Sequence, residues 1–304
     1  MFSTPILFIV FNRPNIAQQS FGQIRKVKPS FLFVAADGPR RDRPDDRQKC
    51  EATRKIIEQI DWPCELKTLF RSENRGCGHG PAEAITWFFE NVERGIILED
   101  DCMADESFFH FCDELLIKYQ DDRRVSMIGG TNPLGKWSNS KYSYSFSVLA
   151  GTWGWASWRR AWASFDYSAV AWQTTEGKKK VAETLVYQSF YRHFSREFDT
   201  YFLNERSDVW DFQWYFARLY SDSCGIIPSM NLISNIGFDG DGTHTFHKNH
   251  TSTLAMFKLQ FPLKHPSFRI NNHHDWYLFE RCINPVKRPF WKKILLKLIN
   301  LSSY

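Results

Sequence analysis

Three acidic residues, Glu99, Asp100 and Asp101, stand side by side directly after a short apolar run at 95–98. Neighbouring carboxylates repel one another and raise each other's pKa, so such a cluster usually faces a cation or helix-end donors. The structural alternative is capping of the next helix, for which Asp105 is better placed. A hard divalent cation, Mg or Mn, held by one or two carboxylates and completed by water and substrate phosphates, suits the cluster. Such an ion would neutralise a diphosphate leaving group.

The chain around the triplet alternates between predicted strands and helices. Apolar runs predict buried strands at 5–11, 31–37, 64–70 and 95–100. Helices are expected at 15–27, at about 45–60, after Pro81, which should open one, and after Asp105, which should cap another. This order predicts an α/β fold with a mainly parallel sheet that has helices on both faces.

Polar features follow all four predicted strands. Arg13, Asp37, the loop at 71–80 and the acidic triplet come after the first, second, third and fourth strand, respectively. Parallel sheets bind ligands at the carboxyl ends of their strands, so these features should line one crevice. Beyond residue 130 the pattern predicts a smaller, irregular region. It has a strand at 141–149, helices across 175–222 with a break near 207–211, and a glycine-rich loop at 234–245 of the kind that closes over ligands.

The net charge of +5 lies at the end of the chain, because 285–304 holds five basic residues and no acid. The neutral remainder argues against nucleic acid as a partner. The basic tail reads as a short amphipathic helix, which fits either peripheral membrane contact or docking on the body. Seven scattered cysteines without a CxxC pair, and no signal peptide or run of about 18 apolar residues, predict a cytoplasmic protein, peripheral at the inner membrane face if the tail binds there.

The segment IILEDDCMADESFFHFCDELL resembles the acidic metal motif of GT-A glycosyltransferases, in the version found in N-glycan GlcNAc-transferases and bacterial nucleotide-diphospho-sugar transferases. The likeness also covers FIVFNRP, the Asp37 turn, GHGPAEAITWFF, LAGTWGWASWRRAW, VWDFQW and IGFDGDGTHT, over about residues 4 to 246. It implies a GT-A, Rossmann-like fold and an inverting, metal-dependent transfer of a sugar from a nucleotide diphosphate, with UDP as the expected nucleotide. The acceptor would be a glycan or a lipid-linked saccharide.

Carried over by position, the resemblance implies that Asp101 binds a Mn or Mg ion on the donor diphosphate. Asp100 and Glu99 would face the ribose and the donor sugar. Arg13 would meet the nucleotide or its phosphates. Taken alone, Arg13 is better explained as a surface ion pair.

The resemblance also assigns residues outside the triplet. Asp37 and His79 would contact the uracil base, although a turn former and a loop histidine are the plainer interpretations. Thr243 and His244 match a segment that folds over the donor, with His244 as a second metal ligand.

An inverting transferase needs one carboxylate to take the acceptor proton and no protein nucleophile. The resemblance places this role on Asp211, whose neighbours Trp210 and Trp214 could shield it and raise its pKa. The sequence departs from the family here, since Phe212 and Gln213 stand where a second acid and a Trp would follow. Asp208 is therefore the reserve candidate, and capping of the next helix is the structural alternative for Asp211.

These expectations divide the chain into a nucleotide-sugar-binding half (1–130), an acceptor and catalytic-base half of the same domain (131–250), an extension (251–284) and the basic tail (285–304). Trp153, Trp155 and Trp158 suit either the core or a sugar-stacking surface. A pyrophosphorylase would need a glycine-rich phosphate loop where this chain has FNRPN. The remaining alternative is a non-catalytic glycan- or nucleotide-sugar-binding protein.

Overall fold

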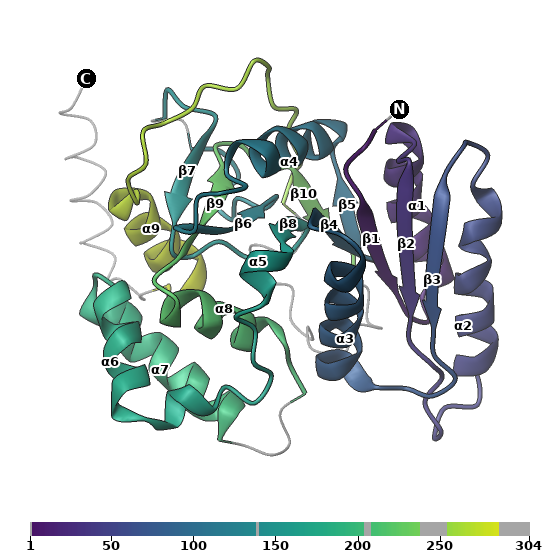
Figure 1. Ribbon diagram of the computed structural model, residues 1–304, viewed down its shortest axis with the longest axis horizontal. Helices are drawn as coiled ribbons and strands as arrows, with labels where there is room; N and C mark the ends of the chain where they lie inside the picture. The colour runs from purple at the N-terminus through teal and green to yellow at the C-terminus, as the bar shows by residue number, and fades with distance from the viewer. Residues whose placement is uncertain (1, 138–139, 204–207, 238–253, 286–304) are drawn as a thin grey trace.

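A computed structural model describes residues 2–137, 140–203, 208–237 and 254–285. Strand and helix alternate through the first half, as the sequence predicts (Figure 1). The strands of this half that join the main sheet are β1 (Ile6–Val10), β2 (Phe31–Ala36), β3 (Glu65–Phe70) and β4 (Arg94–Glu99). Its helices are α1 (Pro14–Val27), α2 (Asp46–Arg54), α3 (Gly76–Asn91) and α4 (Glu106–Lys118), and a 3-10 turn, η1 (Lys55–Gln59), extends α2.

One eight-stranded sheet runs through both halves, in the order β3-β2-β1-β4-β8-β6-β9-β7. The later strands are β6 (Val125–Gly129), β7 (Tyr144–Ser147), β8 (Trp155–Trp158) and β9 (Cys224–Pro228). The four strands from β3 to β4 pair in parallel, as do β6 and β9. Only β8 and the edge strand β7 run antiparallel to their neighbours. The predicted α/β fold with a mainly parallel sheet is confirmed.

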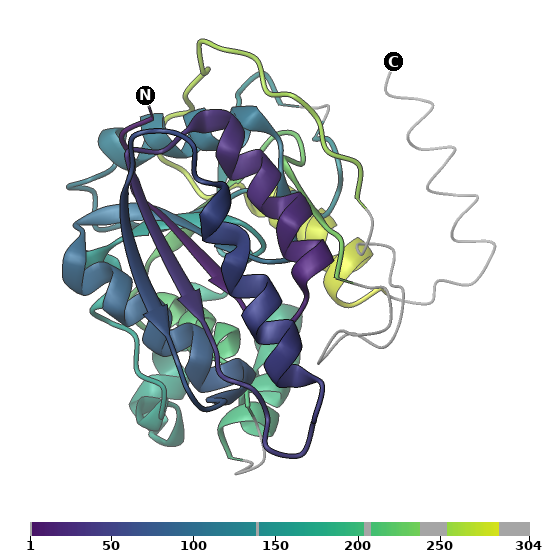
Figure 2. The same cartoon turned by 90° about the vertical axis from the view of Figure 1, so that its right-hand side faces the viewer.

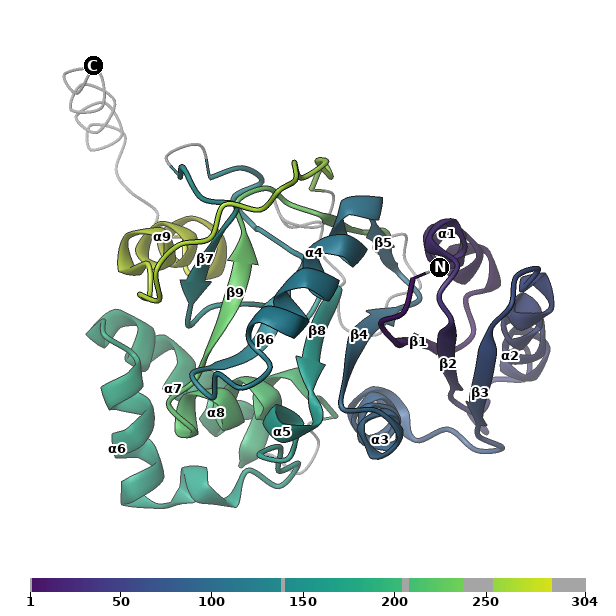
Figure 3. The ribbon, with the colours of Figure 1, turned by 45° about the horizontal axis from the view of Figure 1, so that its top comes forward.

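Helices cover both faces of this sheet. On one face α1 contacts α2 and α4, and on the other α3 contacts α5 (Arg159–Trp162). Figure 2 shows α1 and α2 side by side in front of the strands, and Figure 3 shows α3 and α4 on opposite sides of β4. Both faces of β1 and β4 are therefore buried, which explains why their sequences are continuous apolar runs rather than alternating ones.

The remaining elements form the second half. Three helices, α6 (Thr175–Thr184), α7 (Gln188–Phe202) and α8 (Asp211–Tyr220), contact one another, and α9 (Asn272–Leu278) contacts β7. Two further turns are η2 (Val170–Gln173) and η3 (Phe279–Ile283). The short strands β5 (Cys102–Ala104) and β10 (Ile233–Asn235) pair antiparallel, so the segment after the acidic triplet is joined to chain from the second half.

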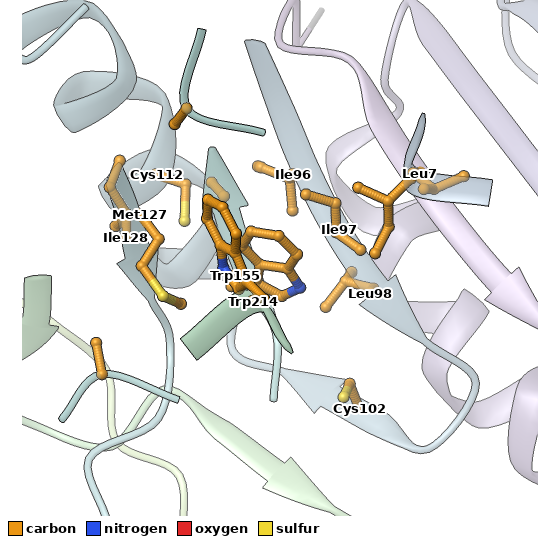
Figure 4. Close-up of a cluster of buried hydrophobic side chains, with 14 of the residues drawn as sticks. Leu7, Ile96, Ile97, Leu98, Cys102, Cys112, Met127, Ile128, Trp155 and Trp214 are labelled. Carbon is orange, nitrogen blue, oxygen red and sulfur yellow. The ribbon is translucent and has the colours of Figure 1, made fainter. Parts of the chain in front are cut away.

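The tryptophans around β8 belong to the core. Trp155 and Trp214 pack beside Ile96, Ile97 and Leu98 of β4 (Figure 4). Trp158 is also buried, whereas Trp153 is half-buried, so the core alternative holds for Trp155 and Trp158.

The expected shielding of Asp211 by its neighbours is wrong. Trp210 and Trp214 are buried against Trp155, at centroid distances of 5.9 and 5.8 Å, and Asp211 is exposed. Both indole rings contribute to the interior because apolar burial there outweighs any contact they could make with a solvated carboxylate.

One helix start also differs from the prediction. Helix α3 begins at Gly76, five residues before Pro81, which lies inside the helix. Side-chain acceptors from a distant part of the chain stabilise this earlier start, as described below. Asp105 caps α4 as predicted, accepting the Ser107 N–H at 2.9 Å. No helix among the described ranges has the length and apolarity to cross a bilayer. Thr243, His244 and residues 286–304 lie outside those ranges.

Candidate functional site

A cavity of about 300 Å³ lies at the carboxyl ends of β1, β2, β3 and β4. Predicted site residues that line it are Arg13, Asp37, Glu99 and Asp100, together with Asn74, Gly76, Cys77 and Gly80 of the 71–80 loop. The structure therefore brings all four predicted polar features to one crevice. The shared edge of parallel strands is what collects residues so far apart in sequence.

Arg13 neutralises part of the acidic triplet. Its Nη2 donates to Asp100 and to Asp101 Oδ2, the latter at 3.0 Å, and its Nε lies 3.4 Å from Asp100 Oδ2. Burial raises the pKa of Asp100 to about 6, although the Arg13 charge opposes this shift. The ion pair explains how two adjacent acids are tolerated at the end of a buried strand.

Glu99 has the most perturbed carboxyl of the triplet. Burial, and then the charges of Asp101, Asp100 and Asp211, raise the pKa of Glu99 to about 8. These surroundings therefore favour the protonated form of Glu99. The influence of Asp211, which is 112 positions further along the chain, shows that α8 begins close to the acidic end of β4.

Asp101 lies at the junction of the triplet with β10. Its Oδ2 accepts from Arg13 and its Oδ1 from Asn235 Nδ2 at 3.2 Å. Gly237 packs so closely that a Cβ there would lie 2.4 Å from Asp101 Oδ2. The Asp101 side chain keeps 16% of its surface exposed.

The donor set around Asp101 fits one kind of metal site. Within the described ranges, no three His, Cys, Asp or Glu side chains are grouped so that they could hold an ion by themselves. A Mg or Mn ion would therefore be held by one or two carboxylates and completed by water and phosphate oxygens, which is the usual arrangement for Mg at phosphate sites. Asp101 and Asp100 suit such an ion if Arg13 releases them.

Asp37 fixes the loop that precedes α3 through hydrogen bonds to its carboxylate. Its carboxylate accepts the N–H of Gly38 at 2.9 Å, the N–H of Arg75 at 2.9 Å and Nδ2 of Asn74 at 2.9 Å. Burial raises the pKa of Asp37, while the Arg75 and Gly38 N–H groups oppose the shift. Asp37 thus shapes one wall of the cavity by fixing the loop before α3.

Asp208 lies outside α3, but its carboxylate accepts hydrogen bonds from backbone N–H groups at the N-terminus of that helix. Its two carboxylate oxygens accept the N–H groups of Cys77 at 2.8 Å and Gly78 at 2.7 Å. Gly76 and Gly78, on either side of Cys77, let the Asp208 carboxylate come this close. A Cβ on Gly76 would lie 2.2 Å from an Asp208 oxygen, and a Cβ on Gly78 would lie 2.4 Å from one. Free N–H groups at a helix start need such acceptors, which explains why α3 begins before Pro81. Asp208 lines the cavity, but its carboxylate has a structural task.

Asp211 occupies a second cavity, of about 160 Å³, between α8 and the loop at 149–152. It is the first residue of α8, is exposed, and accepts the Phe212 N–H at 3.0 Å. His79 is not brought into the main cavity. Its ring stacks on Tyr167 at a centroid distance of 3.9 Å and borders a separate hollow with Phe165.

Sequence reasoning missed a second polar network in the cavity wall. Asp46 is buried, and its carboxylate accepts from Arg40 Nε at 2.6 Å and from Asn12 Nδ2 at 2.7 Å. The Arg40 hydrogen bond holds the pKa of Asp46 down at about 2. Asn12, Arg40 and Arg71 all line the cavity. Arg71 belongs to the predicted 71–80 loop, and Asn12 lies beside Arg13 just after β1, so the strand-end rule that selected Arg13 could have selected Asn12 too.

No protein-family model matches the chain, and no curated protein matches it. Solved structures that resemble it include 4-diphosphocytidyl-2C-methyl-D-erythritol synthase from Anaerococcus prevotii, with 11% identity and a TM-score of 0.32 over 55% of this chain and 76% of that chain. A UDP-glucose pyrophosphorylase has 10% identity and a TM-score of 0.31 over 53% and 78%. The inositol-1-phosphate CTP transferase of T. maritima has 9% identity and a TM-score of 0.33 over 55% and 76%. Likeness at this level assigns the chain to no family.

Proposed function

We propose that the protein is an inverting, metal-dependent glycosyltransferase that moves a sugar from a nucleotide diphosphate, UDP in the first instance, to a hydroxyl of a glycan or lipid-linked saccharide. One observation supports this most directly. The main cavity contains Glu99, and the carboxylate of Asp211 in the second cavity is close enough to raise the Glu99 pKa. A donor pocket and a separate carboxylate on the acceptor side are what an inverting transfer requires.

In this proposal the nucleotide and diphosphate occupy the main cavity, and Arg13 exchanges a carboxylate partner for a donor phosphate. Asp101 would hold the Mn or Mg ion, which supplies neutralisation of the leaving diphosphate. Asp211 accepts the proton of the acceptor hydroxyl. The hydroxyl oxygen forms the bond to the anomeric carbon while the bond from that carbon to the diphosphate oxygen breaks on the opposite side.

The exposure of Asp211 is compatible with this role. An exposed carboxylate is accessible to the hydroxyl of an acceptor and can take up its proton, whereas Glu99, whose pKa burial raises, is the weaker candidate for a base. In this proposal Asp211 is the base, and Glu99 in its protonated form would donate a hydrogen bond to the donor sugar.

The first experiment is thermal unfolding of the purified protein with a panel of nucleotides, with and without Mn. A ligand at 100 times its dissociation constant stabilises by about 2.7 kcal/mol. UDP should stabilise only when Mn is present, and Asp101→Ala should abolish the gain. If no nucleoside diphosphate changes the melting temperature with Mn, the chain has no donor site and a glycan-binding protein becomes the better account.

A second assay separates the transferase from its nearest rival. The wild type should release UDP slowly from a UDP-sugar by transfer to water, and pyrophosphate should not accelerate consumption of the UDP-sugar. Pyrophosphate-dependent formation of UTP would instead identify a pyrophosphorylase.

The basic segment at 285–304 allows a test of whether the acceptor is lipid-linked. If that acceptor is lipid-linked, the full chain should bind vesicles containing anionic lipid, and removal of residues 285–304 should abolish this binding while leaving the UDP response intact. Equal binding by both chains would remove the membrane from the proposal.

A further inference from the structure

The second cavity is lined by one face of α8. Asp211, Tyr215 and Arg218 are spaced at i, i+4 and i+7 on this helix, so they lie in line, and all three border the cavity. Opposite them is the backbone of the loop at 149–152. The cavity thus combines the proposed base with a tyrosine and an arginine.

Arg218 is buried without a matching anion. It is 2% exposed, and its Nη2 donates to the Ala150 carbonyl at 2.8 Å. Its Nε and Nη1 have no acceptor, and no carboxylate in the described ranges forms an ion pair with it. Burial lowers the pKa of Arg218 to about 10, and the groups that oppose this shift are Tyr215 and Cys224, neither of which is an acid of the Asp or Glu type.

The Tyr215 hydroxyl is a second buried polar group without a hydrogen-bond partner. The Tyr215 ring lies 5.2 Å from Arg218 Cζ. Two polar groups at neighbouring positions of one cavity wall are therefore unsatisfied together. Buried polar groups are nearly always hydrogen-bonded, and buried charges are nearly always paired, because the uncompensated cost is large.

A contrasting arginine shows what a purely structural role looks like. The guanidinium of Arg160 donates to four backbone carbonyls, those of Tyr119, Gln120, Asp122 and Val125. Arg160 is partly buried, and these bonds tie the segment at 119–125 to α5. Arg218 makes one such bond, so the fold uses only a small part of its donor capacity.

We propose that Arg218, with the Tyr215 hydroxyl, binds an acidic group of the acceptor, a carboxylate or a phosphate. This inference rests on the proposed function, and it specifies the acceptor as an acidic saccharide. Arg218 borders the cavity, and its buried Nε and Nη1 would reach a ligand there by rotation about the terminal torsions of the side chain. The guanidinium would also offset the negative charge of Asp211, which would otherwise repel an acidic acceptor from the same small cavity.

The test compares Arg218→Met with the matched control Arg160→Met, using thermal unfolding and titration by NMR. Glucuronate and glucose 6-phosphate are the acidic probes, and glucose is the neutral one. The wild type should bind at least one acid more tightly than glucose, and the preferred acid distinguishes a carboxylate from a phosphate. Arg218→Met should weaken binding of that acid about 10- to 100-fold, since hydrogen bonds to charged groups contribute that much.

The melting temperatures of the two variants provide a second test. Arg218→Met removes an uncompensated buried charge and should leave the melting temperature unchanged or higher, whereas Arg160→Met should lower it. Equal binding of acids and glucose by the wild type, or a fall in melting temperature for Arg218→Met as large as that for Arg160→Met, would overturn the proposal. The UDP response with Mn is measured in the same proteins. If it is present while the acids are not distinguished, only this inference fails; if it is absent from the wild type, the proposed function fails.

Discussion

Arg13 Nη2 lies 3.0 Å from Asp101 Oδ2, so a guanidinium occupies the carboxylate that a divalent ion would need. In the proposed function, Arg13 and the metal would compete for Asp101 until a diphosphate arrives that can bind both. If the proposed function holds, the free protein should bind metal weakly, and its metal affinity should depend on the nucleotide.

Arg13→Ala should change the binding of Mn and of UDP in opposite directions. Without nucleotide, Mn should bind about tenfold more tightly than to the wild type, because the competing charge-assisted hydrogen bonds are gone. UDP should bind more weakly, since a phosphate partner is lost. Titration calorimetry of Mn and UDP measures both changes, with Arg25→Ala, an exposed arginine, as control. Weaker Mn binding by Arg13→Ala would contradict the competition.

Asp208 and Asp211 should separate into a structural and a catalytic carboxylate. Asp208→Ala should lower the free energy of unfolding by about 1–2 kcal/mol, because two N–H groups of α3 lose their acceptor, and should reduce kcat less than about tenfold. Asp211→Asn should have the reverse effect, with turnover reduced about 10²- to 10⁴-fold and little change in stability. Chemical denaturation and UDP release measure the two quantities.

The exposed Asp121 serves as the control for both variants. Loss of turnover in Asp208→Ala with Asp211→Asn active would transfer the role of base to Asp208.

Glu99→Gln should stabilise the protein in a pH-dependent way. The folded protein keeps its Glu99 proton up to a pKa of about 8, whereas the unfolded chain releases it above about 4.5. The wild type therefore loses stability as pH rises from 4.5 to 8, because the folded state binds more protons in this window. The gain in melting temperature from Glu99→Gln should be small at pH 4.5 and largest above pH 8.

Thermal unfolding across this range, with the exposed variant Glu90→Gln as reference, is the measurement. A constant difference between Glu99→Gln and the wild type at every pH would show that Glu99 is not held in its protonated form.

Asp45 and Asp46 form a matched pair for testing the cavity wall. Asp46→Ala should cost about 1–3 kcal/mol, since it leaves the Arg40 guanidinium and the Asn12 amide without their acceptor. Asp45→Ala should cost less than about 0.5 kcal/mol, because Asp45 is exposed and pairs with Lys49 at the surface. Urea denaturation of both variants distinguishes them, and similar costs would place the two carboxylates in equivalent surroundings.

The sequence was sufficient for strands β1 to β4 and for the gathering of Arg13, Asp37, Glu99 and Asp100, because strand ends follow from apolar runs and parallel strands share an edge. It did not predict β6, β8 or β9, which complete the sheet. It could not choose between Asp45 and Asp46. Both stand at the start of a charged helix, and only the packing of that helix against the Asn12 loop decides which one is buried.

Other features depend on contacts between distant parts of the chain. The start of α3 before Pro81 depends on Asp208, more than a hundred residues later. The unsatisfied Arg218 shows no local signal either, since an arginine in a helix usually reaches solvent. Tertiary packing sets both outcomes, and no periodicity in the sequence records it.

The antiparallel pair β5–β10 has a consequence for how the protein is made. Asn235 contacts Asp101 across 134 positions, so a ribosome releases the acidic triplet long before it releases the strand that covers it. Parallel strands β1 to β4 can assemble from the nascent chain, yet the loop after them stays open until residue 237 has emerged. A chain interrupted before that point would leave three neighbouring acids without their cover, because Asp101 gains its contact with Asn235 only once translation has passed residue 235.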